Sequence, residues 1–150
     1  MSVLIFIDQS EGHVKKASIE ALSYGSKVAE LLGTTAEGVV LGTTNEDLSD
    51  FGRYGVKKIH HVKQDSLNHL DSHVFTKVIA EVVKSSGANC IIFSNNVDGK
   101  AIAPRLSARM KAGLVSGAVA LPDRAAAWHT VPTRPRAPRW LGRAHGPASD

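Results

Sequence analysis

The segment spanning residues 88–123 constrains the fold more than any other part of the sequence. Its pattern predicts a strand, a turn, a helix and a second strand at residues 89–93, 94–99, 99–112 and 114–121. The first strand is a short run of β-branched and aromatic residues, as expected when both faces of a strand are buried. Ile102, Leu106 and Met110 recur every four residues. This spacing gives the helix one apolar face, and Gly113 is expected to close the helix.

A strand–helix–strand unit crosses over right-handed and joins two parallel strands. The same alternation fills the preceding sequence, with strands predicted at 3–7, 35–41 and 56–62 and helices at 13–32, within 45–55 and at 72–87. We therefore predict an α/β domain with three layers, Rossmann-like, around a mainly parallel five-stranded sheet of order 3-2-1-4-5. That order places the carboxyl ends of the first and fourth strands side by side. Asp8 and residues 94–99 are then expected to face one crevice.

Polar residues at the helix starts are expected to act as caps. Ser72 is placed to cap the helix over 72–87, and Asn96 or Asp98 is placed to cap the helix that follows. Residues 94–99 follow the carboxyl end of a strand, where the functional groups of open parallel sheets collect.

Composition limits the cellular setting. A single cysteine cannot form an internal disulfide, and no run approaches the roughly 20 apolar residues of a membrane span. The N-terminal apolar run lacks a basic segment before it and ends at Asp8, so we interpret it as a first strand rather than a signal peptide. We expect a cytoplasmic protein without membrane insertion. The net charge of +4 comes mainly from the arginines of residues 124–150, so the folded part is expected to have no nucleic-acid partner.

The composition changes abruptly at residue 124. Residues 124–150 contain both tryptophans and four of the six prolines, but no Lys, Ile, Phe or Glu. Such a segment is expected to be disordered, which divides the chain into a domain at 1–123 and a tail at 124–150. Two origins remain open for the tail. It is either a frameshift product that begins after Asp123 or a native basic, proline-rich arm.

The known nucleotide motifs are missing. No Gly-x4-Gly-Lys-Ser/Thr loop occurs in the chain, and no Gly-x-Gly-x-x-Gly follows the first strand. Backbone N–H groups at the start of the helix over 99–112 could still hold a phosphate. The alternative is that residues 94–99 form only a capped turn.

Histidine and cysteine residues do not assemble a metal site by spacing. His60 and His61 are adjacent in a strand and point to opposite faces, so they cannot share an ion. His69 and His73 are four residues apart, but a helix boundary is expected between them. We therefore predict no metal ligands. Cys90 is expected to be a buried structural cysteine.

No group of residues amounts to an active site, and we predict no catalytic residues. Ser94 and Ser116 lack the Gly-x-Ser-x-Gly elbow of a nucleophilic serine. Asp8, Asp98 and Lys100 have the chemistry for acid–base work. Asp98 is better explained as a helix cap and Asp8 as the end of a strand.

A basic patch is predicted on the exposed face of the last helix. It comprises Lys100, Arg105, Arg109 and Lys111. Such a patch is either a solvated face or a docking surface for an acidic partner.

Three segments of the chain resemble the electron transfer flavoprotein alpha subunit. The most specific piece reads Ala-Pro-Arg-Leu-Ser-Ala-Arg at 103–109 and Ala-Gly-Leu-Val-Ser at 112–116. This piece is part of a run at 75–117, which together with the runs at 3–33 and 37–42 resembles the N-terminal domain of that subunit over about residues 1–123. Gly117 departs from the family pattern, because many members carry an acidic residue after the serine.

The resemblance implies a role for the chain. The family is a heterodimer of alpha and beta subunits that carries electrons through one FAD, from acyl-CoA and other dehydrogenases toward the respiratory chain. It is an electron carrier rather than an enzyme, with functions that include fatty acid beta-oxidation. The N-terminal alpha domain is implied to be the scaffold that packs on the beta subunit, while most FAD contacts come from a second, C-terminal alpha domain. That domain has no counterpart in this sequence. We therefore expect a truncated alpha subunit that holds no FAD alone, and its cofactor-binding residues stay unassigned.

A second functional class stays open. Universal stress proteins share this α/β architecture and bind nucleotides as free-standing modules. They usually show a Gly-x2-Gly phosphate motif after the fourth strand, whereas residues 95–102 contain only Gly99. The missing motif favours the electron transfer flavoprotein interpretation.

Overall fold

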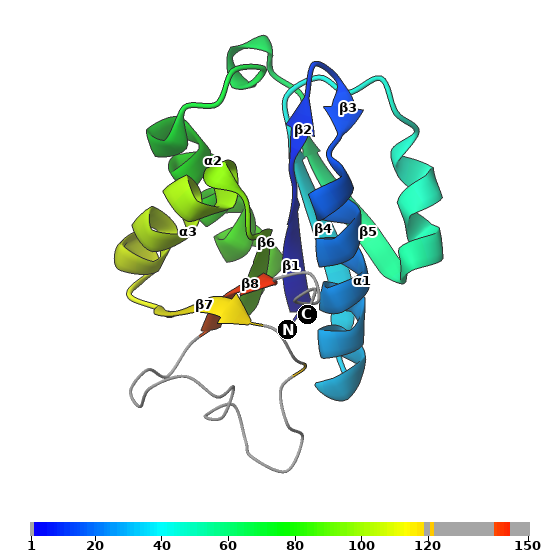
Figure 1. Ribbon diagram of the computed structural model, residues 1–150, viewed down its shortest axis with the longest axis vertical. Coiled ribbons are helices and arrows are strands. Elements are labelled where there is room, and N and C mark those ends of the chain that lie inside the picture. The colour runs from blue at the N-terminus through cyan, green and yellow to red at the C-terminus, as the bar shows by residue number, and fades with distance from the viewer. Residues whose placement is uncertain (1, 119–120, 122–139, 145–150) are drawn as a thin grey trace, which may run out of the picture.

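A computed structural model describes residues 2–118, 121 and 140–144 of the chain. Its elements, in chain order, are β1 (Ser2–Ile7), β2 (Gln9–Ser10), β3 (His13–Val14), α1 (Lys16–Leu31), β4 (Thr35–Leu41), η1 (Leu48–Tyr54), β5 (Val56–Val62), η2 (Asp65–Leu67), α2 (Ser72–Ser86), β6 (Cys90–Ser94), α3 (Val97–Met110), β7 (Gly113–Ala118) and β8 (Trp140–Ala144). The predicted α/β fold with a parallel sheet is confirmed, and helices cover both faces of the sheet (Figure 1).

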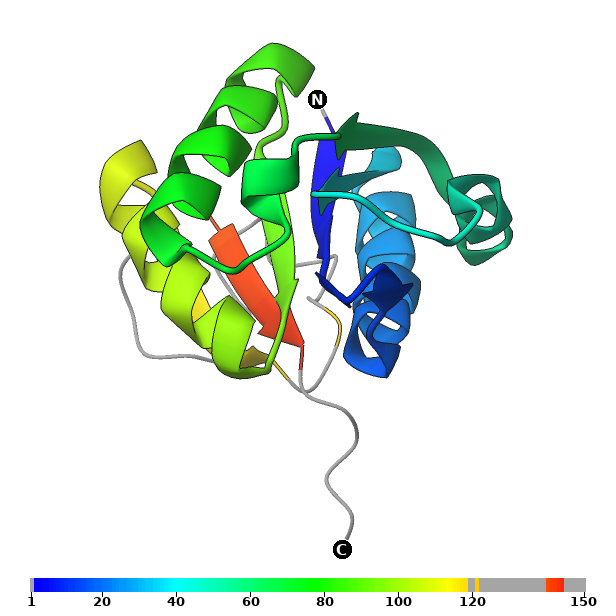
Figure 2. The same ribbon diagram turned by 90° about the horizontal axis from the view of Figure 1, so that it is seen from above.

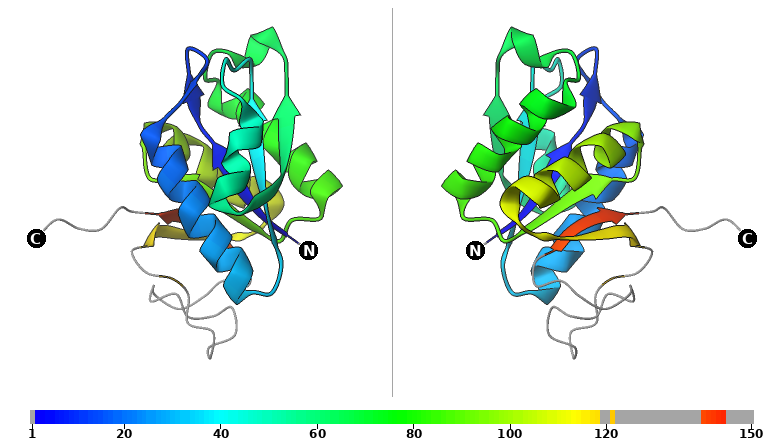
Figure 3. Two further views of the ribbon diagram at one scale, coloured as in Figure 1. Left: turned by 90° about the vertical axis from the view of Figure 1, so that its right-hand side faces the viewer. Right: turned by 90° about the vertical axis from the view of Figure 1, so that its left-hand side faces the viewer.

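The sheet contains one strand more than predicted. Its order is β5-β4-β1-β6-β8-β7, so the predicted order holds except that β8 lies between β6 and β7. β8 pairs in parallel with both neighbours (Figure 3). The prediction that residues 124–150 are disordered is therefore wrong for Trp140–Ala144. The other residues of that range lie outside the described part of the chain. This strand contains no proline, and so all five of its residues keep the backbone N–H groups that a ladder needs.

Two apolar clusters fill the space between the layers. Leu4, Phe6 and Phe93 pack with α2 and α3 on one face of the sheet, and Val3 and Ile5 pack with α1 and η1 on the other. Figure 2 shows this separation, with α1 on one side of the strands and α2 and α3 on the other. All six residues of β1 are buried, because this strand is covered from both sides.

Several predicted element boundaries are wrong. The helix expected over 13–32 begins only at Lys16, because residues 9–14 form the β2–β3 hairpin around Glu11 and Gly12. Both turn residues have positive φ values, 52° and 83°, which no helix accommodates.

The caps also differ from two predictions. Asp71, not Ser72, caps α2 by accepting hydrogen bonds from the N–H groups of His73 and Val74. Lys111, at φ 51°, ends α3 in place of Gly113. Asn96 caps α3 as one of the two predicted candidates, because its Oδ1 accepts a hydrogen bond of 2.9 Å from the N–H of Gly99.

None of the helices described is long and apolar enough to cross a membrane.

Removal of β8 should weaken the whole sheet. A chain that stops after residue 139 loses the strand that joins β6 to β7, whereas a chain that stops after residue 144 keeps it. Because each ladder hydrogen bond contributes about 1 kcal/mol net, we expect the shorter chain to lose at least about 3 kcal/mol of unfolding free energy. Urea denaturation followed by circular dichroism measures this difference. Equal stability of the two chains would contradict a ladder position for β8.

Candidate functional site at the switch point of the sheet

The order of the strands reverses at β1, which pairs with β4 on one side and β6 on the other. The connections after β1 and β6 leave toward opposite faces, and in open parallel sheets a crevice forms at that point. The structure brings Asp8 and residues 94–99 together there, as the strand order predicts. Asn96 Nδ2 donates a hydrogen bond of 2.9 Å to Asp8 Oδ2.

Asp8 is held rigidly at the end of β1. Its side chain is buried, and the residue is only 3% exposed. The backbone N–H of Asp8 donates to Ser18 Oγ at 2.8 Å, and the same hydroxyl donates to the Asp8 carbonyl at 3.1 Å. The backbone N–H of Lys15 donates to that carbonyl as well, at 3.0 Å. The first turn of α1 is thereby tied to the end of β1.

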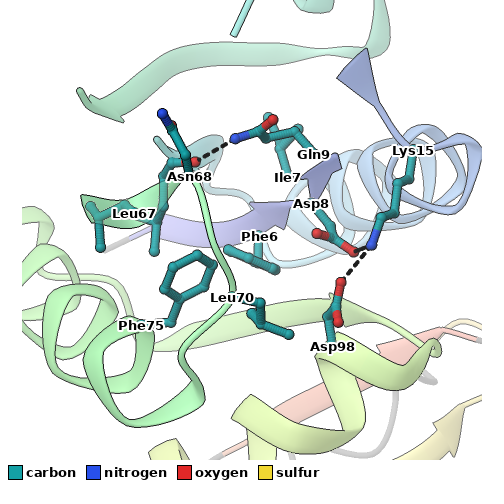
Figure 4. A pocket seen from close by; sticks show the side chains of 11 residues that line it. Phe6, Ile7, Asp8, Gln9, Lys15, Leu67, Asn68, Leu70, Phe75 and Asp98 are labelled. Carbon is teal, nitrogen blue, oxygen red and sulfur yellow. Dashed lines mark hydrogen bonds and ion pairs between the residues drawn. The ribbon is translucent and has the colours of Figure 1, made fainter. Parts of the chain in front are cut away.

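Lys15 reaches the crevice because the β2–β3 hairpin folds back onto the connection after β4. The N–H of Val14 donates to Glu46 Oε1 at 2.8 Å, and Thr44 Oγ1 donates to the Gly12 carbonyl at 3.0 Å. Lys15 follows Val14, and its ammonium group points at two carboxylates. Its Nζ lies 3.0 Å from Asp8 Oδ2 and 2.5 Å from Asp98 Oδ2 (Figure 4).

The two carboxylates respond differently to this environment. Burial, with a contribution from the hydrogen bond to Asp98, raises the pKa of Asp8 to about 6, and Lys15 only partly opposes the shift. Burial also acts to raise the pKa of Asp98, but hydrogen bonds with Lys15 and Asp8 outweigh it and hold this pKa below its ordinary value. Burial acts to lower the pKa of Lys15, but its bonds to both carboxylates raise it. At pH 7 the three groups carry one net negative charge.

A cavity of about 210 Å³ opens beside these charges. Most of its lining residues come from the end of β1, from the segment around η2, and from α2 and α3, and Figure 4 shows them. The apolar side chains are those of Phe6, Ile7, Leu41, Leu67, Leu70 and Phe75, and the polar ones are those of Asp8, Gln9, Lys15, Asn68 and Asp98. An apolar surface with a few convergent polar groups is the usual composition of a binding pocket.

Two residues of this site were missed in the sequence. The sequence predicts Lys15 inside a helix rather than before its start, although Gly12 signals the turn that precedes it. From the sequence, no role is predicted for Asn68. Its Oδ1 accepts a hydrogen bond of 2.8 Å from the N–H of Thr43, which fixes one wall of the cavity.

His60 and His61 are not among the residues that line the cavity. His60 Nε2 lies 2.6 Å from Glu37 Oε2, and His61 Nε2 lies 2.7 Å from the Gly42 carbonyl oxygen. The start of α2 at Ser72 separates His69 from His73, as expected. Within the described ranges, no group of three or more His, Cys, Asp or Glu side chains is placed to hold a metal ion.

Cys90, Ser94 and Lys100 are not among the residues that line the cavity. Cys90 is buried in the cluster beneath α1, and burial raises the pKa of its thiol to about 12, which disfavours the nucleophilic thiolate. Ser94 is buried at the end of β6, and Lys100 is exposed on α3.

The predicted basic patch lies on an exposed face of α3. Lys100, Arg105, Arg109 and Lys111 are all exposed. Arg105 Nη1 donates to the Ala101 carbonyl at 2.9 Å. A role for this patch in docking stays a prediction.

The comparison with known families gives a clear result. Residues 3–136 match the electron transfer flavoprotein domain. The chain belongs to this family. The chain is 29% identical over 120 residues to the electron transfer flavoprotein subunit alpha of Clostridium acetobutylicum, covering 79% of this chain and 36% of that protein.

Two further relatives carry different names. Protein FixB of Clostridium saccharobutylicum is 26% identical over 133 residues, or 89% of this chain and 40% of that protein. The acryloyl-CoA reductase electron transfer subunit beta of Anaerotignum propionicum is 27% identical over 115 residues, or 76% of this chain and 31% of that protein. The chain thus spans two fifths or less of the length of these relatives. Two of these three relatives are named as electron transfer subunits, and the third is named FixB.

The cavity does not fit the flavin dinucleotide that the family implies. Pockets that enclose drug-sized ligands usually measure about 300–1,000 Å³, and this cavity of about 210 Å³ is smaller. Asp8 and Asp98 line it and would repel the pyrophosphate. No step of electron transfer is therefore assigned to these residues.

Removal of the Lys15 side chain should leave the carboxylates of Asp8 and Asp98 without the cation between them. We expect Lys15→Met to destabilise the fold by about 1–3 kcal/mol at pH 7.5, because a hydrogen-bonded charge loses its partner. The loss should shrink at pH 5, where Asp8 is protonated. Urea denaturation at both pH values tests this. The control Lys84→Met removes an exposed pair with Glu81 and should cost at most about 0.5 kcal/mol. Equal losses in the two variants would contradict the role of Lys15.

The raised pKa of Asp8 predicts a distinct pH dependence. Between its ordinary value of 3.8 and about 6, Asp8 binds its proton more tightly in the folded than in the unfolded chain. Its contribution to stability is therefore greatest below pH 4 and falls as the pH rises to 6. The unfolding free energy of Asp8→Asn should accordingly rise relative to that of the unchanged protein across this window. Denaturation at pH 4, 5, 6 and 7 measures the difference, and a constant difference would refute the raised pKa.

Proposed function

We propose that this chain corresponds to part of an electron transfer flavoprotein alpha subunit and acts as the scaffold that packs on a beta subunit. The family match over residues 3–136 carries the proposal. In the assembly, one FAD would carry electrons from acyl-CoA and other dehydrogenases toward the respiratory chain, as in fatty acid beta-oxidation. The described residues would contribute a rigid sheet and a docking face rather than flavin contacts, since their cavity does not fit the cofactor.

For the electron donors, we propose a class of enzyme rather than individual enzymes. One relative is named for acryloyl-CoA reductase, and another is named FixB. We therefore propose dehydrogenases of acyl-CoA type as donors that reach this chain only through the heterodimer. The single cysteine supports the cytoplasm as the place of action.

The division of the chain is part of the same proposal. We place the α/β domain at residues 1–123, with β8 supplied from the 124–150 segment. Pairing of β8 with β6 and β7 supports a role of that segment in the fold. Translation of the encoding DNA in every frame after codon 123 tests whether the segment results from a frameshift.

The nucleotide-binding alternative is disfavoured by charge. A phosphate that approached the cavity would meet Asp8 and Asp98, of which only one is balanced by Lys15. The start of α3 is already capped by Asn96. Neither feature resembles a phosphate cradle, which presents unpaired backbone N–H groups to the ligand.

Reconstitution with a partner tests the proposed function. We expect the purified chain to be colourless and to bind FAD with a Kd no lower than about 1 mM. Co-expression with an electron transfer flavoprotein beta subunit should give a co-purifying complex, and absorption spectroscopy detects any flavin. A yellow chain without partner would contradict the proposal.

A nucleotide titration separates the two classes. Saturating ATP at 100 times its Kd would stabilise a nucleotide-binding module by about 2.7 kcal/mol. We expect no thermal shift with ATP, and a shift of that size would favour the universal-stress-protein class instead.

A further inference from the structure

The cavity at the switch point has an excess of negative charge that the described residues do not balance. Lys15 contacts both Asp8 and Asp98, which leaves one negative charge over when both acids are ionised. Burial makes such an excess costly, because the charged form of a carboxylate is poorly solvated inside a protein. A second cation at this position would therefore be favoured, and an anion disfavoured.

An apolar rim lies beside these charges. Val97 is 81% exposed, Leu70 44% and Val74 39%. Leu70 lines the cavity, whereas Val74 and Val97 do not line it but are next in the sequence to Phe75 and Asp98, which do. Their positions at or just before the starts of α2 and α3 put them at the same edge of the sheet (Figure 1). Leu121 is the other large apolar side chain that is exposed within the described residues.

Such a rim is typical of a protein-binding surface. Exposed apolar side chains that gather around a pocket mark interaction sites, whereas scattered ones need no explanation. Interfaces place arginine and aromatic anchors in central pockets surrounded by weaker apolar contacts. An acidic pocket inside an apolar rim is complementary to a cationic side chain within an apolar surface.

We propose that this cavity is a socket for an arginine or lysine side chain of a partner protein, whose cationic head contacts Asp8 and Asp98. This rests on the proposed function, in which the chain works as one subunit of a complex. The aliphatic stem of the incoming side chain lies against Leu70 and Phe75. Flanking apolar residues of the partner cover Val74 and Val97.

The titration of Asp8 supports the same assignment. Its pKa of about 6 shows that the positive charge already present does not compensate for burial and the neighbouring acid. The charged and titratable groups that face Asp8 in the described residues are Lys15, before α1, and Asp98, on α3. A bound cation lowers the pKa of Asp8, so binding releases a proton and weakens as the pH falls below 6.

A matched pair of small molecules tests the charge requirement. The probes are n-butylguanidinium and its neutral isostere n-butylurea, titrated into the ¹⁵N-labelled protein at pH 7.5. We expect the backbone amide signals of Leu70, Phe75 and Asp98 to shift with the cation. The cation should bind at least about tenfold more tightly than the urea, which corresponds to about 1.4 kcal/mol. Equal binding, or shifts elsewhere only, would overturn the proposal.

Variants identify the groups responsible. Asp98→Asn should weaken binding of n-butylguanidinium about tenfold and leave n-butylurea unchanged. Glu81→Gln makes the same change of charge at an exposed position of α2 and should have no effect. Leu70→Ala, which removes apolar wall but no charge, should weaken both probes. Unchanged cation binding in Asp98→Asn would overturn the socket.

The pH dependence gives an independent readout. Affinity for n-butylguanidinium should fall by about threefold or more between pH 7.5 and pH 5, and Asp8→Asn should abolish that dependence. An affinity that does not change with pH would exclude Asp8 from the socket.

Peptides distinguish a partner side chain from a free small cation. The probes are blocked Val-Arg-Val and Val-citrulline-Val, which differ only in the charge of the central head group. If a protein supplies the cation, Val-Arg-Val should bind about tenfold more tightly than n-butylguanidinium, because its valines reach the rim. Equal affinities would indicate a free small cation and overturn the partner assignment.

The test of the cation socket can fail or succeed independently of the test of the proposed function. These titrations need no flavin and no beta subunit. A complex that forms while the cation fails to bind would refute only the socket. Binding of the cation by a chain that forms no complex with a beta subunit would refute the proposed subunit role instead.

Discussion

The parallel arrangement around β1 determines where everything else in the molecule lies. Right-handed crossovers place α1 and η1 on one face as the chain moves outward from β1 to β4 and β5. The return to β6 and β7 then places α2 and α3 on the opposite face. The connections after β1 and β6 must diverge as a consequence. The cavity beside Asp8 follows from handedness and strand order, not from any single side chain.

The charges at that point are held by elements far apart in the chain. Asp8 follows β1, Lys15 follows the β2–β3 hairpin, and Asp98 lies in the first turn of α3. A buried carboxylate is costly unless it is paired and hydrogen-bonded, and here the cation and the Asn96 amide offset part of that cost. The remaining negative charge makes the site unsuitable for a phosphate group and complementary to a cation. The family membership and the charge of the cavity both support the proposed role in assembly.

The core elements were predictable because their patterns are local. The apolar runs that form β1 and β6 are continuous in the sequence, as burial on both faces requires, whereas that of β4 is continuous only over residues 39–41. The meeting of Asp8 with residues 94–99 also followed from strand order alone. The hairpin at 9–14 did not, because two two-residue strands have almost no periodicity and their stability depends on Glu46 and on the loop after β4. Lys15 was missed for that reason. β8 was missed because its neighbours in the sequence are rich in proline, whereas its partners in the sheet lie about 25 or more residues away.

The sequence by itself determined the α/β class, the order of the first four strands and the edge of the sheet where polar groups gather, since apolar periodicity and crossover handedness are properties of short segments. Only the tertiary structure decided that Lys15 bridges Asp8 and Asp98, that β8 completes the sheet and that an acidic cavity opens beneath an apolar rim. The Lys15–Asp98 contact joins residues 83 positions apart in the sequence, and the Asp8–Asn96 hydrogen bond joins residues 88 positions apart. Burial sets the protonation of such groups, and burial exists only once the layers have packed.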